Sequence, residues 1–337
     1  MQKLKKAMFW SVKDAERKIV QCELCARRCI IAPGASGFCA VRRNVSGTLR
    51  SLVYEKALGF NIDPIEKKPL YHFHPGSSTF SLCTAGCNLA CKHCQNWFDS
   101  KEFDHIDVPG KHLPKEKVVE LARRTAGISW TYTEPTVFYE YFYDTAKLAK
   151  RVAPELYQTW VSNGYATSEA IRKATKLLDA VNIDYKGDDG FYQKVCSARL
   201  EPVQNALCEL KKARIWLEIT NLLIPGYNDK PEQIKEMVLW IADNLGHDVP
   251  LHFSQFHPDY KLRDAPVTPV HSLEKAAELA KKHLNYVYIG NVQHKLGNTF
   301  CHKCNALLIE RRGYVIINKA EDGRCLNCSQ KIPGVFS

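Results

Sequence analysis

Apolar and amphipathic segments alternate along the chain between about residue 79 and residue 290. The apolar runs are short and rich in β-branched and aromatic residues, a pattern typical of parallel strands buried on both faces. They predict strands at Thr79–Leu82, Ile128–Tyr132, Tyr157–Val161, Ala180–Asp184, Arg214–Thr220 and Leu251–Gln255, with a further candidate at Tyr286–Ile289. The amphipathic stretches predict helices at Lys115–Ala126, Thr136–Ala153, Ser168–Leu178, Glu232–Asn244 and Ser272–His283, and another near Pro202–Lys212.

Repeated strand–helix units with right-handed crossovers form a parallel sheet that curls into a full or partial barrel. Because six strands are well marked, we expect an α/β fold with a partial (β/α)6 barrel of the TIM type over residues 76–297. Residues 1–75 are expected to form an N-terminal Cys-rich metal-binding cap and linker. Residues 298–337 are expected to form a zinc-ribbon-like domain.

Polar residues follow the predicted strands in succession. They are Thr131–Glu134, Ser162–Gly164, Asp184–Gly187, Asn221 and Gln255–His257. In barrel enzymes the carboxyl ends of the strands carry the active site, because the side chains there converge on one mouth. The pattern therefore predicts an active site at this end of the barrel.

Charge and composition narrow the class of protein. The chain has 337 residues, with 47 Lys and Arg against 36 Asp and Glu, and a net charge of +11. The basic residues are scattered in pairs without interleaved aromatic residues, so we do not expect a nucleic-acid partner. No run approaches the roughly 20 apolar residues of a membrane span, and Met8-Phe9-Trp10 is too short a core for a secretory signal. We expect a cytoplasmic protein that does not bind a membrane.

Cysteine is the unusual residue type, since 12 of the 14 cysteines fall into three tight groups. The groups are Cys22, Cys25, Cys29 and Cys39, then Cys83, Cys87, Cys91 and Cys94, and finally Cys301, Cys304, Cys325 and Cys328. Without a secretory signal, CxxC groups of this kind indicate metal ligands and not disulfides. The isolated Cys196 and Cys208 are expected to be free thiols that pack as small hydrophobic residues.

The central group contains a CxxxCxxC motif, Cys87, Cys91 and Cys94, directly after the first predicted strand. Three thiolates suit a 4Fe–4S cluster with one iron that has no protein ligand. If Cys83 were a fourth ligand, the group would be a closed electron-transfer cluster or a zinc site. We favour the open iron, because Cys83 lies at the strand end and Gly86 allows the chain to bend away from it.

The segment Ala85–Asn96, AGCNLACKHCQN, resembles the radical S-adenosylmethionine (radical SAM) superfamily, in the branch of the pyruvate formate-lyase-activating enzymes. The fuller stretch Thr84–Trp97, with TYTEPT, NIDYKG, FHPDYK and the C-terminal CxxC pairs, looks like the AmmeMemoRadiSam-system radical SAM enzymes. The resemblance implies that the open iron chelates the amino and carboxylate groups of SAM. One electron would then cleave SAM to methionine and a 5′-deoxyadenosyl radical, which abstracts hydrogen from a substrate.

The resemblance also implies roles for residues that bind SAM. His93 stands where the superfamily has an aromatic residue against the adenine, and Glu134 ends a Thr-Tyr-Thr-Glu segment where relatives carry Gly-Gly-Glu. Asn163 matches the Asn of a Thr-Asn-Gly segment.

Three further positions complete the implied site. Asp184 and Lys186 match an Asp-x-Lys motif whose lysine meets the methionine carboxylate, and His257 matches a histidine near the adenosine. Glu218 replaces an arginine of the activating enzymes, so that contact does not transfer.

The C-terminal group, with two CxxC pairs separated by twenty residues, fits a four-thiolate zinc site. A ribbon of this size, with a hairpin at Leu307–Ile309 and Tyr314–Ile317, would fold on its metal. A structural role is the main expectation, and partner docking or an auxiliary iron–sulfur cluster are the alternatives.

The N-terminal group, Cys22, Cys25, Cys29 and Cys39, fits structural zinc or an auxiliary iron–sulfur cluster, and its spacing does not decide between them. The stretch Asp63–Pro69, followed by His72 and His74, is expected to be an ordered linker. The alternative is that Lys67 or His72 reaches the substrate.

We therefore expect a radical SAM enzyme with a 4Fe–4S cluster, SAM and zinc, supplied with electrons by a flavodoxin or ferredoxin. The resemblance favours a small substrate handled with Ammecr- and Memo-type proteins. The alternative is an activating enzyme that installs a glycyl radical on a partner enzyme. The rival from another class is a non-enzymatic zinc or iron–sulfur protein.

Overall fold

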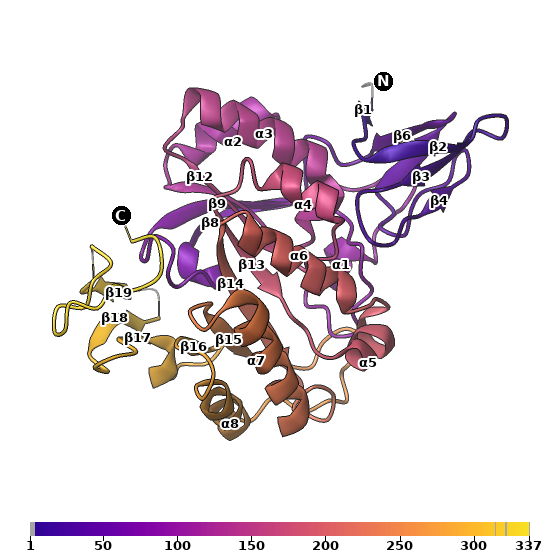
Figure 1. Cartoon of the computed structure of the whole chain (residues 1–337). Helices are drawn as coiled ribbons and strands as arrows, with labels where there is room; N and C mark the ends of the chain where they lie inside the picture. Colours follow the sequence, from indigo (N-terminus) through magenta and orange to yellow (C-terminus); the bar gives the residue numbers. More distant parts are fainter. Residues whose placement is uncertain (1–3, 314, 321, 337) are drawn as a thin grey trace.

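The structure is a computed structural model that describes residues 4–313, 315–320 and 322–336. Its centre is a curved sheet in the order β16-β15-β14-β13-β12-β11-β9-β8 (Figure 1). The parallel strands are β9 (Ser78–Cys83), β11 (Gly127–Trp130), β12 (Tyr157–Ser162), β13 (Ala180–Asp184), β14 (Trp216–Leu223), β15 (Leu251–Gln255) and β16 (Val287–Gly290). The expected α/β partial barrel is confirmed, and the further candidate strand near Tyr286 is its last strand.

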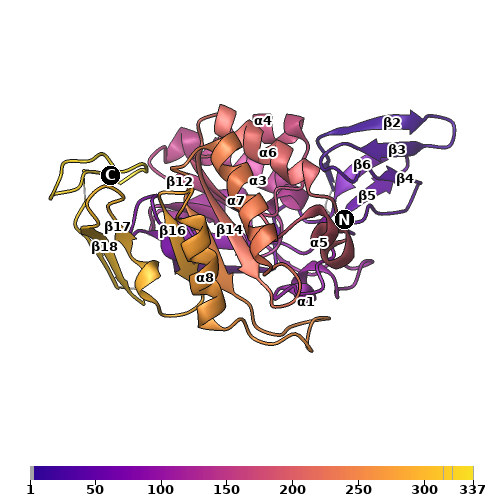
Figure 2. The same cartoon turned by 60° about the horizontal axis from the view of Figure 1, so that its bottom comes forward.

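Helices cover the outer face of this sheet (Figures 1 and 2). They are α2 (Lys115–Ala122), α3 (Tyr139–Val152), α4 (Ser168–Ala174), α6 (Glu201–Lys212), α7 (Pro231–Leu245) and α8 (Val270–Ala280). Each buries an apolar stripe; in α3, Phe142, Ala146 and Ala149 are fully buried. The helix expected to reach Ala126 ends earlier, where the Thr125 hydroxyl donates to the Ala122 carbonyl at 2.8 Å.

The linker expected before the barrel contains an additional strand. β8 (Gly59–Pro64) pairs antiparallel with β9, with Phe60 opposite Leu82 and Asp63 opposite Thr79. Gly, Asn, Asp and Pro in this segment are poor strand formers, and an edge strand tolerates them because one side of it needs no ladder partner. The barrel therefore begins with β8, inside the range expected to be cap and linker.

The N-terminal region consists of small antiparallel sheets. β2 (Trp10–Asp14), β3 (Ile19–Cys22) and β4 (Ile30–Ile31) form one, β1 (Lys5–Lys6), β6 (Thr48–Ser51) and β5 (Arg42–Val45) form another, and β7 (Lys56–Ala57) pairs with β10 (Lys111–His112). This region is joined to α3 by a buried ion pair, in which Arg42 Nη1 lies 2.9 Å from Glu140 Oε1. It is thereby fixed to the barrel.

The C-terminal region is a three-stranded ribbon of β17 (Thr299–Phe300), β18 (Leu307–Arg312) and β19 (Val315–Asn318). The expected hairpin is present. Tyr314, the predicted first residue of its second strand, lies outside the described residues. The ribbon packs beside β16, where the hydroxyls of Tyr288 and Thr299 are 2.9 Å apart. The two terminal regions lie on opposite sides of the barrel (Figures 1 and 2).

None of the helices in the described ranges is both long enough and apolar enough to cross a bilayer.

Candidate functional site

The carboxyl ends of the parallel strands surround a cavity of about 310 Å³. Its walls contain predicted site residues from four successive connections: Cys87, Cys91, His93, Cys94, Glu134, Asn163, Asp184 and Lys186. Three of the predicted polar clusters, those at Thr131–Glu134, Ser162–Gly164 and Asp184–Gly187, thus contribute to one mouth. Asn221 and Gln255–His257 do not line it, and Asn221 donates instead to the Tyr185 carbonyl. A volume of this size lies at the lower end of the range of about 300–1,000 Å³ for small-molecule sites.

The cysteine loop runs from β9 to the short helix α1 (Trp97–Ser100). It turns at Gly86, whose φ of +97° suits glycine and where a Cβ would lie 2.8 Å from the Cys39 carbonyl oxygen. Behind the loop, Lys101 Nζ donates to the Cys87 carbonyl at 2.6 Å. These contacts hold the three thiols of the motif at the cavity.

Cys83 does not line this cavity. Its buried thiol lies 3.7 Å from the Gly59 carbonyl of β8, and burial raises its pKa to about 12. Three thiols therefore face the cavity without the fourth, a donor set that suits a 4Fe–4S cluster with one open iron.

Asn163 holds the first cysteine of the motif. Its Nδ2 lies 2.8 Å from Asn88 Oδ1 and 3.6 Å from Cys87 Sγ, so it donates toward the sulfur and the loop together. Its Oδ1 accepts from Tyr165 N at 2.9 Å, which fixes the orientation of the amide. Asn163 is in this way a positioning residue for Cys87.

Glu134 joins the ends of two strands. Its carboxylate accepts from the Thr136 amide and hydroxyl, from the Ser162 hydroxyl at 2.8 Å and from the Asn163 amide at 2.8 Å. Three of these bonds go to Oε1 and one to Oε2. Burial raises the pKa of Glu134 even though each hydrogen bond favours the charged form. Oε2 therefore keeps more free acceptor capacity than Oε1.

Asp184 and Lys186 form a close pair at the end of β13, with Nζ and Oδ2 2.8 Å apart. Burial alone would lower the pKa of Lys186, but the charges of Asp184 and of a Cys91 thiolate raise it well above its usual value. Lys186 therefore keeps a positive charge at the cavity, where an anionic ligand group is attracted.

His93 is 4% exposed, and its Nδ1 has no hydrogen-bond partner among the described residues. Burial, followed by the charge of Lys186, lowers the pKa of His93 to about 3. The ring is therefore neutral, and its centroid lies 5.8 Å from that of Phe191. An unpartnered buried nitrogen on the cavity wall fits a ligand that supplies the missing contact.

His257 lies outside the cavity. It is exposed, and its Nε2 is 2.8 Å from Nε2 of Gln95, a residue of the cavity wall. The structure thus places His257 at the rim, next to a residue that reaches inward.

The linker before β9 builds part of the wall. Lys67 lines the cavity, and its Nζ lies 3.1 Å from Asp63 Oδ1. Asp63 also binds Lys68 at 2.7 Å and the Tyr132 hydroxyl. Burial alone would raise the pKa of Asp63, but these hydrogen bonds hold it far below its usual value. His72, the other linker candidate, lies away from the cavity against Tyr288 and the Pro333 carbonyl.

Cys196 is a neighbour of the motif that sequence reasoning missed. It ends a π-helical turn, Tyr192–Cys196, and its hydrogen bond to Cys91 raises the Cys91 pKa, with burial as the second cause. Its carbonyl also accepts from Ala90 N at 3.1 Å. No spacing in the sequence signals this contact, because the turn and the motif are about a hundred residues apart.

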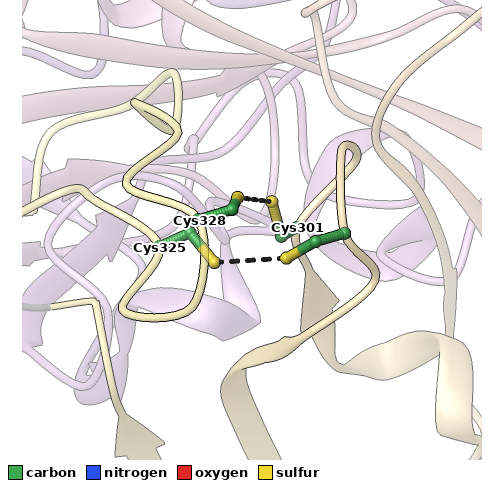
Figure 3. A group of neighbouring side chains, drawn as sticks. Cys301, Cys325 and Cys328 are labelled. Carbon is green, nitrogen blue, oxygen red and sulfur yellow. Dashed lines mark hydrogen bonds between the residues drawn. The ribbon is translucent and has the colours of Figure 1, made fainter.

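The C-terminal cysteines converge on one point (Figure 3). Cys301 and Cys328 have their sulfurs 3.6 Å apart, those of Cys304 and Cys325 are 3.5 Å apart, and all four lie within 4.8 Å of one another. A tetrahedral ion bound at about 2.3 Å places its thiolates about 3.8 Å apart. The group therefore suits one metal ion, and zinc stays the prediction.

The family model described as the radical SAM superfamily matches residues 81–241. An uncharacterized protein of Methanocaldococcus jannaschii is 45% identical over 336 residues, which are 98% of this chain and 99% of the relative.

Solved structures show weaker likeness. A domain of the pyruvate-formate lyase-activating enzyme from Bacteroides vulgatus gives a TM-score of 0.44 at 17% identity, and covers 49% of this chain and 99% of that one. SuiB of Streptococcus suis bound to S-adenosylmethionine gives 0.49 at 12% identity, and covers 69% of this chain and 53% of that one.

Proposed function

The chain belongs to the radical SAM superfamily, and we propose that it cleaves SAM reductively to start a hydrogen abstraction from a substrate. When bound at Cys87, Cys91 and Cys94, a 4Fe–4S cluster supplies the single electron that splits SAM into methionine and a 5′-deoxyadenosyl radical. The observation that carries the proposal is the cavity wall with three thiols, from which Cys83 is absent.

The residues around these thiols bind and orient SAM. Lys186 supplies a positive charge for the methionine carboxylate, and Glu134 supplies an acceptor for the methionine amine. His93 presents a neutral ring and an unpartnered Nδ1 to the adenosine. Together they hold SAM in one orientation, so that the bond to be broken stays close to the electron donor.

The walls also provide part of the shielding that the reactive centre needs. Leu89, Val161 and Leu222 add apolar surface to the cavity, and Tyr132 and Lys67 narrow it on the side of β8. A radical that abstracts hydrogen needs such shielding, because stray side chains and solvent would otherwise react with it.

The electrons come from a reductant of the flavodoxin or ferredoxin type. We propose a small substrate handled together with Ammecr- and Memo-type proteins, as the sequence resemblance implies.

The test is anaerobic reconstitution with iron, sulfide, SAM and dithionite, followed by measurement of 5′-deoxyadenosine. We expect the product from the native chain and from Cys83→Ala, and none above background from Cys91→Ala. Cys83→Ala is the matched control, because it removes a buried thiol a few residues from the motif without touching the cavity.

An equal loss in both variants would mean that Cys83 is a ligand and that the site is closed. A glycyl radical signal on an added partner enzyme would instead support the activating-enzyme alternative.

A further inference from the structure

The N-terminal cysteines surround a small void on the other side of the cysteine loop. Cys22 ends β3, Cys29 precedes β4, and their backbones are joined by a hydrogen bond of 2.9 Å from Cys22 N to Cys29 O. Cys25 bridges to Ala166 of the barrel. Together with Cys39 they line a cavity of about 10 Å³, which is the space that one water-sized sphere occupies.

The spacing of their sulfurs differs from that of the C-terminal group. Within the described ranges, only Cys301, Cys304, Cys325 and Cys328 bring three or more ligand atoms within 4.8 Å of one another. The N-terminal thiols do not converge in this way, and neither do Cys87, Cys91 and Cys94. The sulfurs of the N-terminal group are thus spread more widely than those of a zinc site. The same is true of Cys87, Cys91 and Cys94, which hold the iron–sulfur cluster in the radical SAM superfamily.

This difference in the spacing of the sulfurs distinguishes a zinc site from a 4Fe–4S cluster site. A single zinc ion draws four thiolates to about 3.8 Å from one another, which leaves no void at their centre. In a 4Fe–4S cluster each thiolate binds a different iron, so the sulfurs stand farther apart around a central space. The wider spacing of the N-terminal sulfurs, and not the size of the void, matches the second arrangement.

The lining of the void suits an anionic sulfur cluster. Arg42 is 2% exposed and lines the cavity, and its Nε has no partner among the described residues. Its Nη1 is held by Glu140 at 2.9 Å, so the guanidinium is fixed in place. Arg27 also lines the cavity, with its guanidinium 3.5 Å from the centroid of the Phe38 ring. A buried, unpartnered N–H among thiols indicates a missing acceptor.

The void also lies directly against the catalytic loop. Asn88, the neighbour of Cys87, lines it, and Arg27 Nε donates to the Asn88 carbonyl at 2.6 Å. The Cys39 carbonyl packs against Gly86 so closely that a Cβ there would lie 2.8 Å away. The two groups of thiols are therefore neighbours in space, although Cys39 and Cys87 are far apart in the sequence.

From these observations we propose that Cys22, Cys25, Cys29 and Cys39 bind a second 4Fe–4S cluster, next to the cluster of Cys87, Cys91 and Cys94. The identity of the N-terminal metal does not rest on the proposed SAM cleavage. Only the claim that this metal lies beside a first cluster rests on the proposed function.

Metal analysis of the full chain, reconstituted anaerobically with iron and sulfide, tests the identity. We expect about eight iron atoms and one zinc ion per chain. About four iron atoms and two zinc ions would overturn the proposal. These counts come from the unmodified protein, so they decide the question even if every variant fails to fold.

Two matched double variants assign the metals. Cys25→Ser with Cys29→Ser, at two half-buried positions, should lower the iron to about four atoms and leave zinc at one. Cys304→Ser with Cys328→Ser, likewise half-buried, should remove the zinc and leave all eight iron atoms. Unchanged iron in the first variant would contradict the proposal.

Electron paramagnetic resonance of the fully reduced protein tests whether the second cluster lies next to the first. Two neighbouring paramagnetic clusters should give a spectrum broadened by their interaction, and the Cys25→Ser, Cys29→Ser variant should give a single unbroadened signal. If the signals of the native protein simply add without interaction, the clusters are not neighbours. A protein that holds both clusters but yields no 5′-deoxyadenosine would refute the proposed function and leave the second cluster in place.

Discussion

The two terminal regions each offer four cysteines in a short stretch, yet they build different sites. In the C-terminal ribbon the sulfurs lie within 4.8 Å of one another, whereas the N-terminal sulfurs stand around a void. The ribbon group belongs to a small hairpin domain at the edge of the barrel. The N-terminal group is built onto the barrel itself, through the bridge from Cys25 to Ala166 and the packing of Cys39 on Gly86.

The contrast shows what sequence spacing does and does not determine. Both groups contain a CxxC pair, which places two sulfurs near each other. The positions of the remaining sulfurs depend on where the rest of the chain holds them. In the ribbon the turns before and after the hairpin bring them together, whereas in the N-terminal region Cys25 and Cys39 are held against the barrel.

We expect the largest effect from loss of the metal in the C-terminal ribbon, because the ribbon should then unfold. Cys325→Ser should remove the predicted zinc ion and unfold residues 299–320, because a zinc site of this kind contributes about 10–16 kcal/mol to a domain with a small core. Amide hydrogen exchange should show lost protection in the ribbon and unchanged protection in the barrel. Cys208→Ser, a half-buried thiol on α6, is the control. A ribbon that stays protected without zinc would show that its core alone holds it.

The next effect concerns the anchor of the N-terminal region. Arg42→Ala leaves Glu140 buried without its partner, which costs about 3–5 kcal/mol. Denaturant unfolding under anaerobic conditions should detect this loss, and Arg42→Ala with Glu140→Ala should cost less than Arg42→Ala alone. The neighbouring Arg43→Ala, a half-buried residue that faces Ser36, should change the free energy of unfolding by far less. Equal losses in Arg42→Ala and Arg43→Ala would refute the anchoring role.

The attachment of the ribbon should weaken in acid. Burial lowers the pKa of His72 from 6.5 to about 4, although Glu218 opposes the shift. His72 faces Tyr288 on β16, Arg311 on β18 and His252 on β15. Because the unfolded chain binds the proton more readily, stability is full above pH 6.5 and falls as the pH drops toward 4, by at most about 3 kcal/mol.

His72→Asn should flatten this part of the pH dependence, when the free energies of unfolding of both proteins are compared between pH 7.5 and pH 5. Zinc loss in acid affects both proteins alike, so their difference isolates the histidine. Parallel curves would mean that His72 does not carry the effect.

The smallest expected effect distinguishes the two neighbouring clusters. Asn163→Ala removes the donor 3.6 Å from Cys87 Sγ, a bond worth about 0.5–1.5 kcal/mol, or roughly 20–60 mV for one electron. The potential of the catalytic cluster should fall by this amount in a potentiometric titration, while that of the N-terminal cluster stays unchanged. A shift in both potentials would show a general loosening of the loop.

Much of the fold could be predicted because parallel strands buried on both faces are apolar throughout. β8 escaped prediction, since Gly59, Asn61, Asp63 and Pro64 lack strand propensity and only the pairing with β9 makes them a strand. To predict β8, one would have to know that this segment pairs with β9.

Some of the site residues could likewise be predicted from the sequence, and others could not. The carboxyl ends of the strands locate Glu134, Asn163 and Lys186 from the sequence, because parallel strands bring these ends together. Cys196 reaches the site through a π-helical turn, which leaves no pattern in the sequence. Lys67, which the sequence offered only as an alternative, reaches it from the 3-10 turn Ile65–Lys67 that follows β8.

Electron–nuclear double resonance shows whether one iron of the cluster is open to SAM. The reduced Cys25→Ser, Cys29→Ser variant isolates the catalytic signal, and SAM with isotopically labelled amino and carboxylate groups supplies the probe. We expect hyperfine coupling of the cluster to both labels, unchanged when Cys83 is also replaced by Ala. An intact cluster that shows no coupling to either label would contradict it.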